Sequence, residues 1–200
     1  MRGKKQIGFL ITSAAFLLVV SVTSLTGVAQ SSRNRAYVKA GQSEPSRTAN
    51  HIAREVRHEL LMLPWYGVFD WIEGNVTPDG RVTLRGWVTR PTTKSSAVKS
   101  VKDIEGVTQV NDQIKVLPLS SNDDRLRIAV YRSLFNDNSP LFRYALGSNP
   151  SIHIIVENGR VTLKGVVSNE GDRNVANVKA NGVSGVFEVN NQLVVEKGGE

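Results

Sequence analysis

The chain contains no cysteine among its 200 residues. This absence excludes disulfide frameworks, cysteine-ligated zinc or iron–sulfur sites, thiol nucleophiles and lipid attachment through a cysteine side chain. Hydrophobic residues at 40% and charged residues at 22% are ordinary values for a globular protein. The length leaves room for one ordinary domain or two small ones.

A concentrated basic region is also missing from the globular part, although the formal net charge of the chain is +7. Residues 50–118 carry nine basic and eight acidic side chains, and residues 122–200 carry nine of each, so the excess lies in the first 49 residues. A protein that tracks phosphates concentrates lysine and arginine on its binding module. We therefore expect no nucleic-acid partner.

The motifs of common catalytic sites are absent from the sequence, which has no Gly-x-Ser-x-Gly elbow and no Walker-type glycine-rich loop. His51, Glu55 and His58 fall on one face of a predicted helix, at a spacing that could contact a metal ion. Only these three ligands are in reach, and Arg54 and Arg57 would repel a cation. We interpret them as a solvated helix face and predict no metal, no cofactor and no enzymatic activity.

The N-terminal segment predicts export. Three positive charges precede an apolar run, and Gly27 and Ala29 form a small-x-small cleavage site, which is typical of a signal peptide over residues 1–29. The alternative is an uncleaved inner-membrane anchor, because residues 7–29 are long enough to cross a hydrocarbon core of about 30 Å. In both cases the remaining chain is expected in the periplasm. Residues 30–49 are polar and lack periodicity, which predicts a flexible tether.

An internal repeat organises the rest of the chain. Gly80–Val88 (GRVTLRGWV) returns as Gly159–Val167 (GRVTLKGVV), an offset of 79 with seven of nine positions identical. The offset persists to the segments 111–116 and 190–195. Upstream, an apolar helical stripe aligns at an offset of 74, pairing Ile52 with Leu126, Val56 with Val130 and Leu60 with Leu134. The chain therefore contains two copies of one module, at residues 50–118 and 122–197.

Each copy predicts the element order αββαβ. The helical stripe is followed by two alternating apolar runs around a turn, Pro78-Asp79-Gly80 in the first copy and Asn158-Gly159 in the second, which is the pattern of a β-hairpin. A short helix and a last strand complete the copy. The predicted fold is α+β, with a three-stranded mixed sheet and two helices on one face of it. Gly86 and Gly165 interrupt equivalent strands, where we expect a helix to press close to the sheet.

The repeated GRVTL-x-G-x-V hairpin, the GV-x-x-V-N-x-x-L/I-x-V ending and the αββαβ order resemble the BON domain. The resemblance implies a non-enzymatic module of osmotically induced periplasmic proteins and nodulation proteins, which attaches proteins to phospholipid membranes. It therefore predicts an envelope protein that binds anionic phospholipid surfaces and supports envelope integrity or stress tolerance. The alternative is a protein-interaction or chaperone-like module, whose open sheet face or edge strand receives another envelope protein. Without a cysteine the chain differs from related lipoproteins, so membrane attachment would come from its leader or its surface.

Aromatic residues gather where the first helix of each copy meets the hairpin, in residues 64–71 and 140–146. One interpretation is that these rings close two small cores, with Phe69 as a core member. The other is that some enter a lipid interface, with Trp65, Tyr66 and Tyr144 expected to be exposed. The aromatic candidates for contact with a lipid or partner are Trp65, Tyr66, Phe142 and Tyr144.

Basic residues recur on the strand positions that alternate with the apolar ones. If both helices cover one face of each sheet, these positions line the opposite, open face. Such a face can be solvated, can pack against the other module, or can contact anionic headgroups or an acidic partner. The basic contact candidates are Arg81, Arg85, Arg160 and Lys164.

Overall fold

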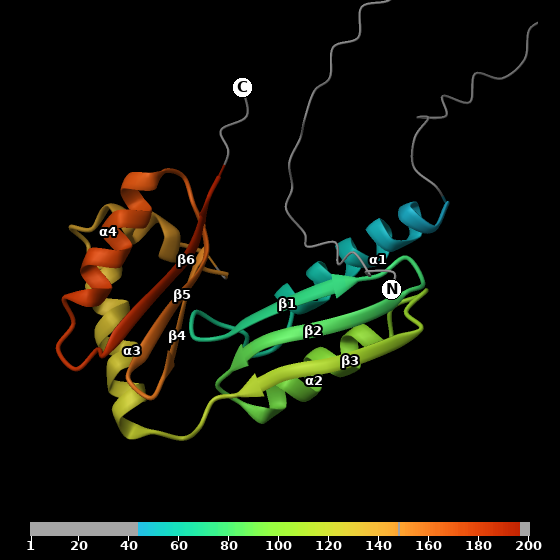
Figure 1. Ribbon diagram of the computed structural model, residues 1–200, viewed down its shortest axis with the longest axis horizontal. Coiled ribbons are helices and arrows are strands. Elements are labelled where there is room, and N and C mark those ends of the chain that lie inside the picture. The colour runs from blue at the N-terminus through green and yellow to red at the C-terminus, as the bar shows by residue number, and fades with distance from the viewer. Residues whose placement is uncertain (1–43, 148, 197–200) are drawn as a thin grey trace, which may run out of the picture.

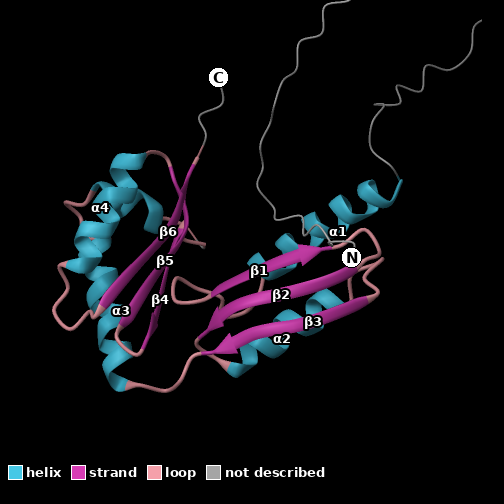
Figure 2. Cartoon of the chain, in the orientation of Figure 1, coloured by secondary structure: helices cyan, strands magenta, loops and turns pink. Residues whose placement is uncertain are grey.

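The computed structural model describes residues 44–147 and 149–196, which fold into two modules (Figures 1 and 2). The first module consists of α1 (Glu44–Leu61), β1 (Trp71–Val76), β2 (Arg81–Val88), α2 (Pro91–Lys102) and β3 (Gln109–Val116). The second consists of α3 (Ser121–Leu134), the 3-10 helix η1 (Pro140–Ala145), β4 (Ile152–Glu157), β5 (Arg160–Val167), α4 (Glu170–Asn181) and β6 (Glu188–Val195). The predicted order αββαβ is confirmed in both copies, and η1 is an addition to the second.

Each module has one three-stranded sheet, in the order β1-β2-β3 and β4-β5-β6. The hairpin strands pair antiparallel, and the last strand pairs parallel with the middle one. The register is the same in both copies, because Gly86 lies opposite Ile72 and Gly165 lies opposite Ile152. The predicted mixed sheet is therefore confirmed.

The helix starts follow from local side chains. Ser120 caps α3 by accepting a hydrogen bond from the N–H of Asp123, and Asn169 caps α4 by accepting one from the N–H of Asp172. Pro91 begins α2. The N–H of the first helical residue makes no hydrogen bond within the helix, so a proline at this position costs none.

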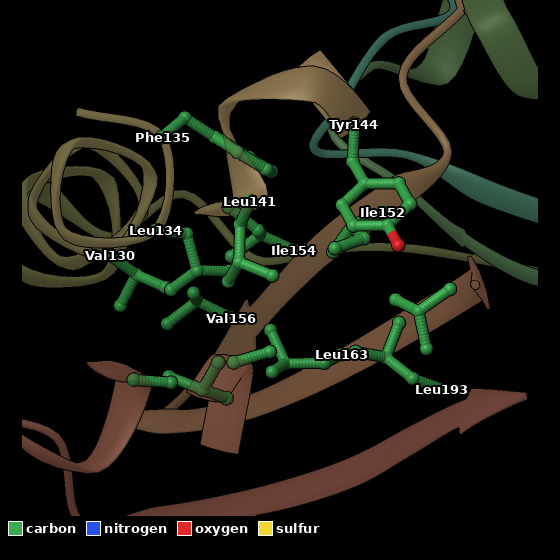
Figure 3. Close-up of a cluster of buried hydrophobic side chains, with 14 of the residues drawn as sticks. Val130, Leu134, Phe135, Leu141, Tyr144, Ile152, Ile154, Val156, Leu163 and Leu193 are labelled. Atoms are coloured by element: carbon green, nitrogen blue, oxygen red, sulfur yellow. The ribbon is translucent and has the colours of Figure 1, made fainter. Parts of the chain in front are cut away.

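Both helices of a module cover the same face of its sheet. In Figure 1, α3 and α4 lie on one side of β4–β6, and α1 and α2 lie behind β1–β3. The core of the first module is formed by residues of both helices and by alternate residues of the strands. The buried members include Ile52, Val56, Leu60, Ala97, Val101, Ile72, Val82, Leu84, Val88 and Ile114. The core of the second module has the same plan and adds Leu141 and Tyr144 from η1 (Figure 3).

The two repeat glycines are required by a neighbouring strand and not by a helix, so that expectation is wrong. Gly86 and Gly165 have φ values of 137° and 122°. A Cβ atom would lie 1.9 Å from the carbonyl oxygen of Trp71 at Gly86, and 1.9 Å from that of Ser151 at Gly165. The helix presses closest at Gly74, where a Cβ atom would lie 2.7 Å from Val56 of α1.

The first helix begins earlier than predicted. α1 starts at Glu44, inside the range 30–49 that the sequence suggested as a tether. The predicted signal peptide, the alternative anchor at residues 7–29 and most of the predicted tether lie outside the described residues. Among the helices that the structure describes, none is long and apolar enough to cross a membrane.

Candidate functional site

The segment between α1 and β1 connects the two modules. The carbonyl of Val68 accepts a hydrogen bond of 2.7 Å from the N–H of Ile154, so this segment lies along the outer edge of β4. Phe69 packs against the core of the second module, with its ring 6.2 Å from that of Tyr131 on α3. Phe69 is thus a core contact, as predicted, but it belongs to the core of the neighbouring module.

His153 lies between the modules. Its ring centroid is 5.6 Å from that of Tyr66 and 5.0 Å from that of Trp71, and its Nδ1 is 3.2 Å from the carbonyl oxygen of Gly67. A carbonyl oxygen only accepts, so Nδ1 carries the proton. Burial lowers the pKa of His153, because a charged ring would lose its hydration there.

Tyr66 is half-buried at the same boundary, so the expectation of an exposed ring is not met. Its hydroxyl accepts a hydrogen bond from the N–H of Ile72. Burial raises the pKa of Tyr66 to about 12, because the phenolate would be poorly solvated. The ring packs within the protein and offers little surface to a lipid.

Ion pairs complete the contact between the modules. The Lys164 Nζ lies 2.8 Å from a carboxylate oxygen of Glu73 and 5.8 Å from the centroid of the Trp71 ring. Partial burial of Glu73 opposes its ionisation, but the hydrogen bonds from Lys164 and Trp71 outweigh this effect, so the pKa of Glu73 is lowered. Lys115 pairs with Glu157 at 2.5 Å. The two modules therefore meet through hydrogen bonds, rings and charges, as a short connection between them predicts.

The basic candidates lie on the open sheet faces, as predicted, but each has a partner. Lys164 forms an ion pair with Glu73 at the boundary between the modules. The other three are exposed: Arg81 lies 3.4 Å from Asp79, Arg85 donates to Gln113 at 2.8 Å, and Arg160 lies 3.1 Å from Glu188. Arg81 and Arg160 are therefore each beside a carboxylate, whereas the hydrogen-bond partner of Arg85 is an uncharged amide.

Tyr144 is buried, so the expectation that it is exposed is wrong. Only 8% of the residue is accessible, and its hydroxyl donates to Asp172 at 2.6 Å and accepts from the N–H of Ser168 at 2.8 Å. A ring whose polar end finds such partners is stable inside a core. Phe142 is partly exposed on η1.

The largest exposed aromatic residue near the module boundary is Trp65, just after α1. Trp65 is 72% exposed and Met62 is 68% exposed, and Leu61 at the end of α1 is also exposed. We call these three residues the α1 tip. The guanidinium carbon of Arg90 lies 5.2 Å from the centroid of the Trp65 ring, within range of a cation–π interaction.

A second loop contacts the end of α1. The side-chain amide of Asn149 donates to the carbonyl of Leu61 at 3.1 Å. Leu146, three positions earlier in that loop, is 60% exposed. The sequence indicated Trp65, but Met62, Arg90 and Leu146 were missed. Their exposure depends on tertiary packing, and only the apolar character of Met62 and Leu146 beside the aromatic clusters could have suggested them.

The described residues contain no group of three or more histidine and acidic side chains placed to hold a metal ion. His51 and His58 are exposed on α1, and Glu55 is half-buried. The chemistry available at the α1 tip is therefore apolar and aromatic contact with an adjacent cation.

The sequence model of the BON domain family matches two consecutive segments of the chain, residues 48–118 and 122–197. No curated protein matches the chain. Among solved structures, the C-terminal domain of CdsD, a structural protein of the type III secretion system of Chlamydia trachomatis, is similar over 72% of this chain and 96% of its own, with 14% sequence identity and a TM-score of 0.27. A second CdsD structure from the same organism is similar over 73% of this chain and 92% of its own, with 12% identity and a TM-score of 0.28. Similarities at these TM-scores do not identify a function.

Proposed function

The chain belongs to the BON domain family, and we propose that it is a non-enzymatic protein of the bacterial periplasm that binds anionic phospholipid surfaces through its α1 tip. The predicted leader would deliver it there, and membrane binding would support envelope integrity or stress tolerance. The proposal rests on the family, on the predicted export signal and on the surface chemistry of the first module.

The observation that carries the proposal is the position of Trp65. Its φ of 68° is in the left-handed region, which costs a residue with a side chain about 1–2 kcal/mol. Within the described residues this conformation leaves the ring 72% exposed instead of burying it. An amphipathic tryptophan ring is favoured at the level of lipid headgroups. The left-handed conformation would therefore serve to present the ring to a membrane.

The charges around the α1 tip favour weak binding. Arg90 places one cation beside Trp65, and a cation near an anionic membrane contributes about 1 kcal/mol. Full burial of a large apolar side chain contributes about 1.5–3 kcal/mol. Because Arg81 and Arg160 lie beside acidic partners, affinity would come mainly from the apolar residues.

The test is co-sedimentation of residues 30–200 with vesicles of increasing anionic lipid content. Both hydrophobic cores are contained within residues 52–195, so this chain keeps each core complete. Binding should rise with anionic lipid, and Trp65→Ala should weaken it at all salt concentrations. Phe187→Ala is a matched control, because Phe187 is also exposed and lies 5.2 Å from an arginine, Arg160, in the second module.

Arg90 tests the charge contribution separately. Arg90→Gln should reduce vesicle binding at low salt and have little effect at high salt, because salt screens exposed charges. Arg160→Gln should leave binding close to that of the parent. If the parent ignores anionic vesicles, or if Trp65→Ala and Phe187→Ala bind them equally, the proposed membrane site is wrong.

A further inference from the structure

The two modules have separate hydrophobic cores and are linked by residues 117–120. The loop that precedes β1 lies beside β4 (Figure 1), where the N–H of Ile154 donates to the carbonyl of Val68 and Phe69 packs against the second core. The ion pairs of the boundary are partly exposed, and such pairs contribute little to stability. The boundary is therefore a unit that can open while both modules stay folded.

His153 of β4 is buried in this boundary, with only 5% of the residue accessible. Its ring lies 5.6 Å from that of Tyr66 and 5.0 Å from that of Trp71, both in the first module. Its Nδ1 donates to the carbonyl of Gly67. The joined modules thus hold a neutral imidazole, which packs among rings and has an acceptor for its N–H.

A cation is already present beside this imidazole. Lys164 lies directly opposite His153 in the pairing of β4 with β5, and its Nζ is 5.8 Å from the centroid of the Trp71 ring. Like charges directly opposite each other on adjacent strands are destabilising. Glu73 pairs with Lys164 and offsets part of its charge. A protonated His153 would nevertheless share the Trp71 ring with a second cation.

The first module faces His153 with one buried carboxylate, that of Asp70. This carboxylate already accepts hydrogen bonds from the N–H groups of Thr89, at 2.6 Å, and Gly67, at 3.2 Å. Burial lowers the pKa of His153 and outweighs the opposite effects of the Asp70 charge and of the carbonyl groups of Gly67, Asp70 and Pro150. The joined modules therefore bind a proton at His153 less readily than separated modules, in which water would solvate the ring.

We propose that the module boundary is a pH-sensitive switch, in which protonation of His153 under mildly acidic conditions shifts the two modules toward a separated state, hinged at residues 117–120, with both cores folded. Lower pH favours separation because the separated state binds the additional proton. Separation uncovers three rings that follow the α1 tip in the chain, those of Tyr66, Phe69 and Trp71. The switch does not depend on membrane binding by the α1 tip.

The test is NMR-detected amide hydrogen exchange of chain 30–200 between pH 7.5 and 5.5, corrected for the intrinsic exchange rate at each pH. The Ile154 amide reports on the boundary, because its acceptor is Val68 of the other module. Leu84 and Leu163, fully buried at equivalent positions of β2 and β5, report on the two cores. The protection of Ile154 should be lower than theirs, and should fall by up to about tenfold per pH unit below about pH 6.5, as uptake of one proton requires.

Urea and two variants identify the opening and the proton site. Low urea should speed exchange of Ile154 less steeply than that of the core amides, because separation exposes less surface than unfolding. In His153→Gln, protection of Ile154 should not depend on pH, even if the substitution lowers it throughout. The double variant His51→Gln and His58→Gln is the matched control, because it replaces the other two histidines of the chain, both exposed on α1, and should keep the pH dependence of the parent.

Three results would overturn the proposal. The first is protection of Ile154 that does not change with pH in the parent, or that changes equally in His153→Gln. The second is an Ile154 amide with the same protection and the same urea dependence as Leu84 and Leu163, which would mean that the boundary opens only when the modules unfold. The third is exchange of Ile154 that ignores urea, which would indicate a local fluctuation of β4 and not a separation of the modules.

Discussion

Phe69 couples the stability of the second module to a residue of the first. Its ring packs against the second core and lies 6.2 Å from Tyr131, while its neighbour Val68 is hydrogen-bonded to β4. Replacing a fully buried phenylalanine by alanine costs about 3–5 kcal/mol. Phe69 is partly buried, so we expect Phe69→Ala to lower the free energy of unfolding by about 2 kcal/mol.

The stability lost in Phe69→Ala should be located mainly in the second module. Native-state hydrogen exchange of Phe69→Ala should show faster exchange in β4 and β5, with a smaller change in β1 and β2, although the substitution is in the first module. Phe187→Ala makes the same chemical change at a residue that is 75% exposed, and should stay within about 0.5 kcal/mol of the parent. Loss confined to the first module, or equal effects of the two variants, would refute the reasoning.

Other predictions concern the module boundary, a buried turn and the leader. Because burial lowers the pKa of His153, the unfolded chain binds its proton more readily, so the free energy of unfolding should fall as the pH drops below about 6.5. His153→Gln should show a weaker decline in urea unfolding between pH 7.5 and 5, and an unchanged slope would contradict this cause. Asp123→Ala should cost about 3 kcal/mol in chemical denaturation, because the buried carboxylate accepts from the N–H groups of Asn158 and Gly159, both at 2.9 Å; a loss under about 1 kcal/mol would count against it. N-terminal sequencing of the protein from cells should begin near Gln30, and an intact N-terminus would favour the membrane anchor.

The fold could be predicted because its signals are local. The Asn158-Gly159 turn, the alternating strands beside it and the repetition of both in the first copy define the hairpins without knowledge of distant contacts. The start of α1 at Glu44 was missed, since the six residues before position 50 carry no apolar stripe that marks a helix.

The surface was harder to predict, because exposure depends on partners far along the chain. Tyr144 is buried through Asp172, 28 residues away, and Lys164 is paired with Glu73, 91 residues away. The repeat does not help here, since equivalent positions differ between the copies: Leu61 is exposed, while its counterpart Phe135 is buried. A repeat therefore predicts the shared fold and not the contact surface of either copy.

The most direct test of the membrane site measures whether Trp65 enters a bilayer. Chain 30–200 is bound to anionic vesicles that contain lipids with brominated acyl chains, which quench nearby tryptophan fluorescence. The proposed site predicts strong quenching in the parent and in Trp71→Phe, because Trp71 faces the module boundary, and its loss in Trp65→Phe. Bound protein whose quenching persists in Trp65→Phe, or is absent in the parent, would contradict membrane binding through the α1 tip.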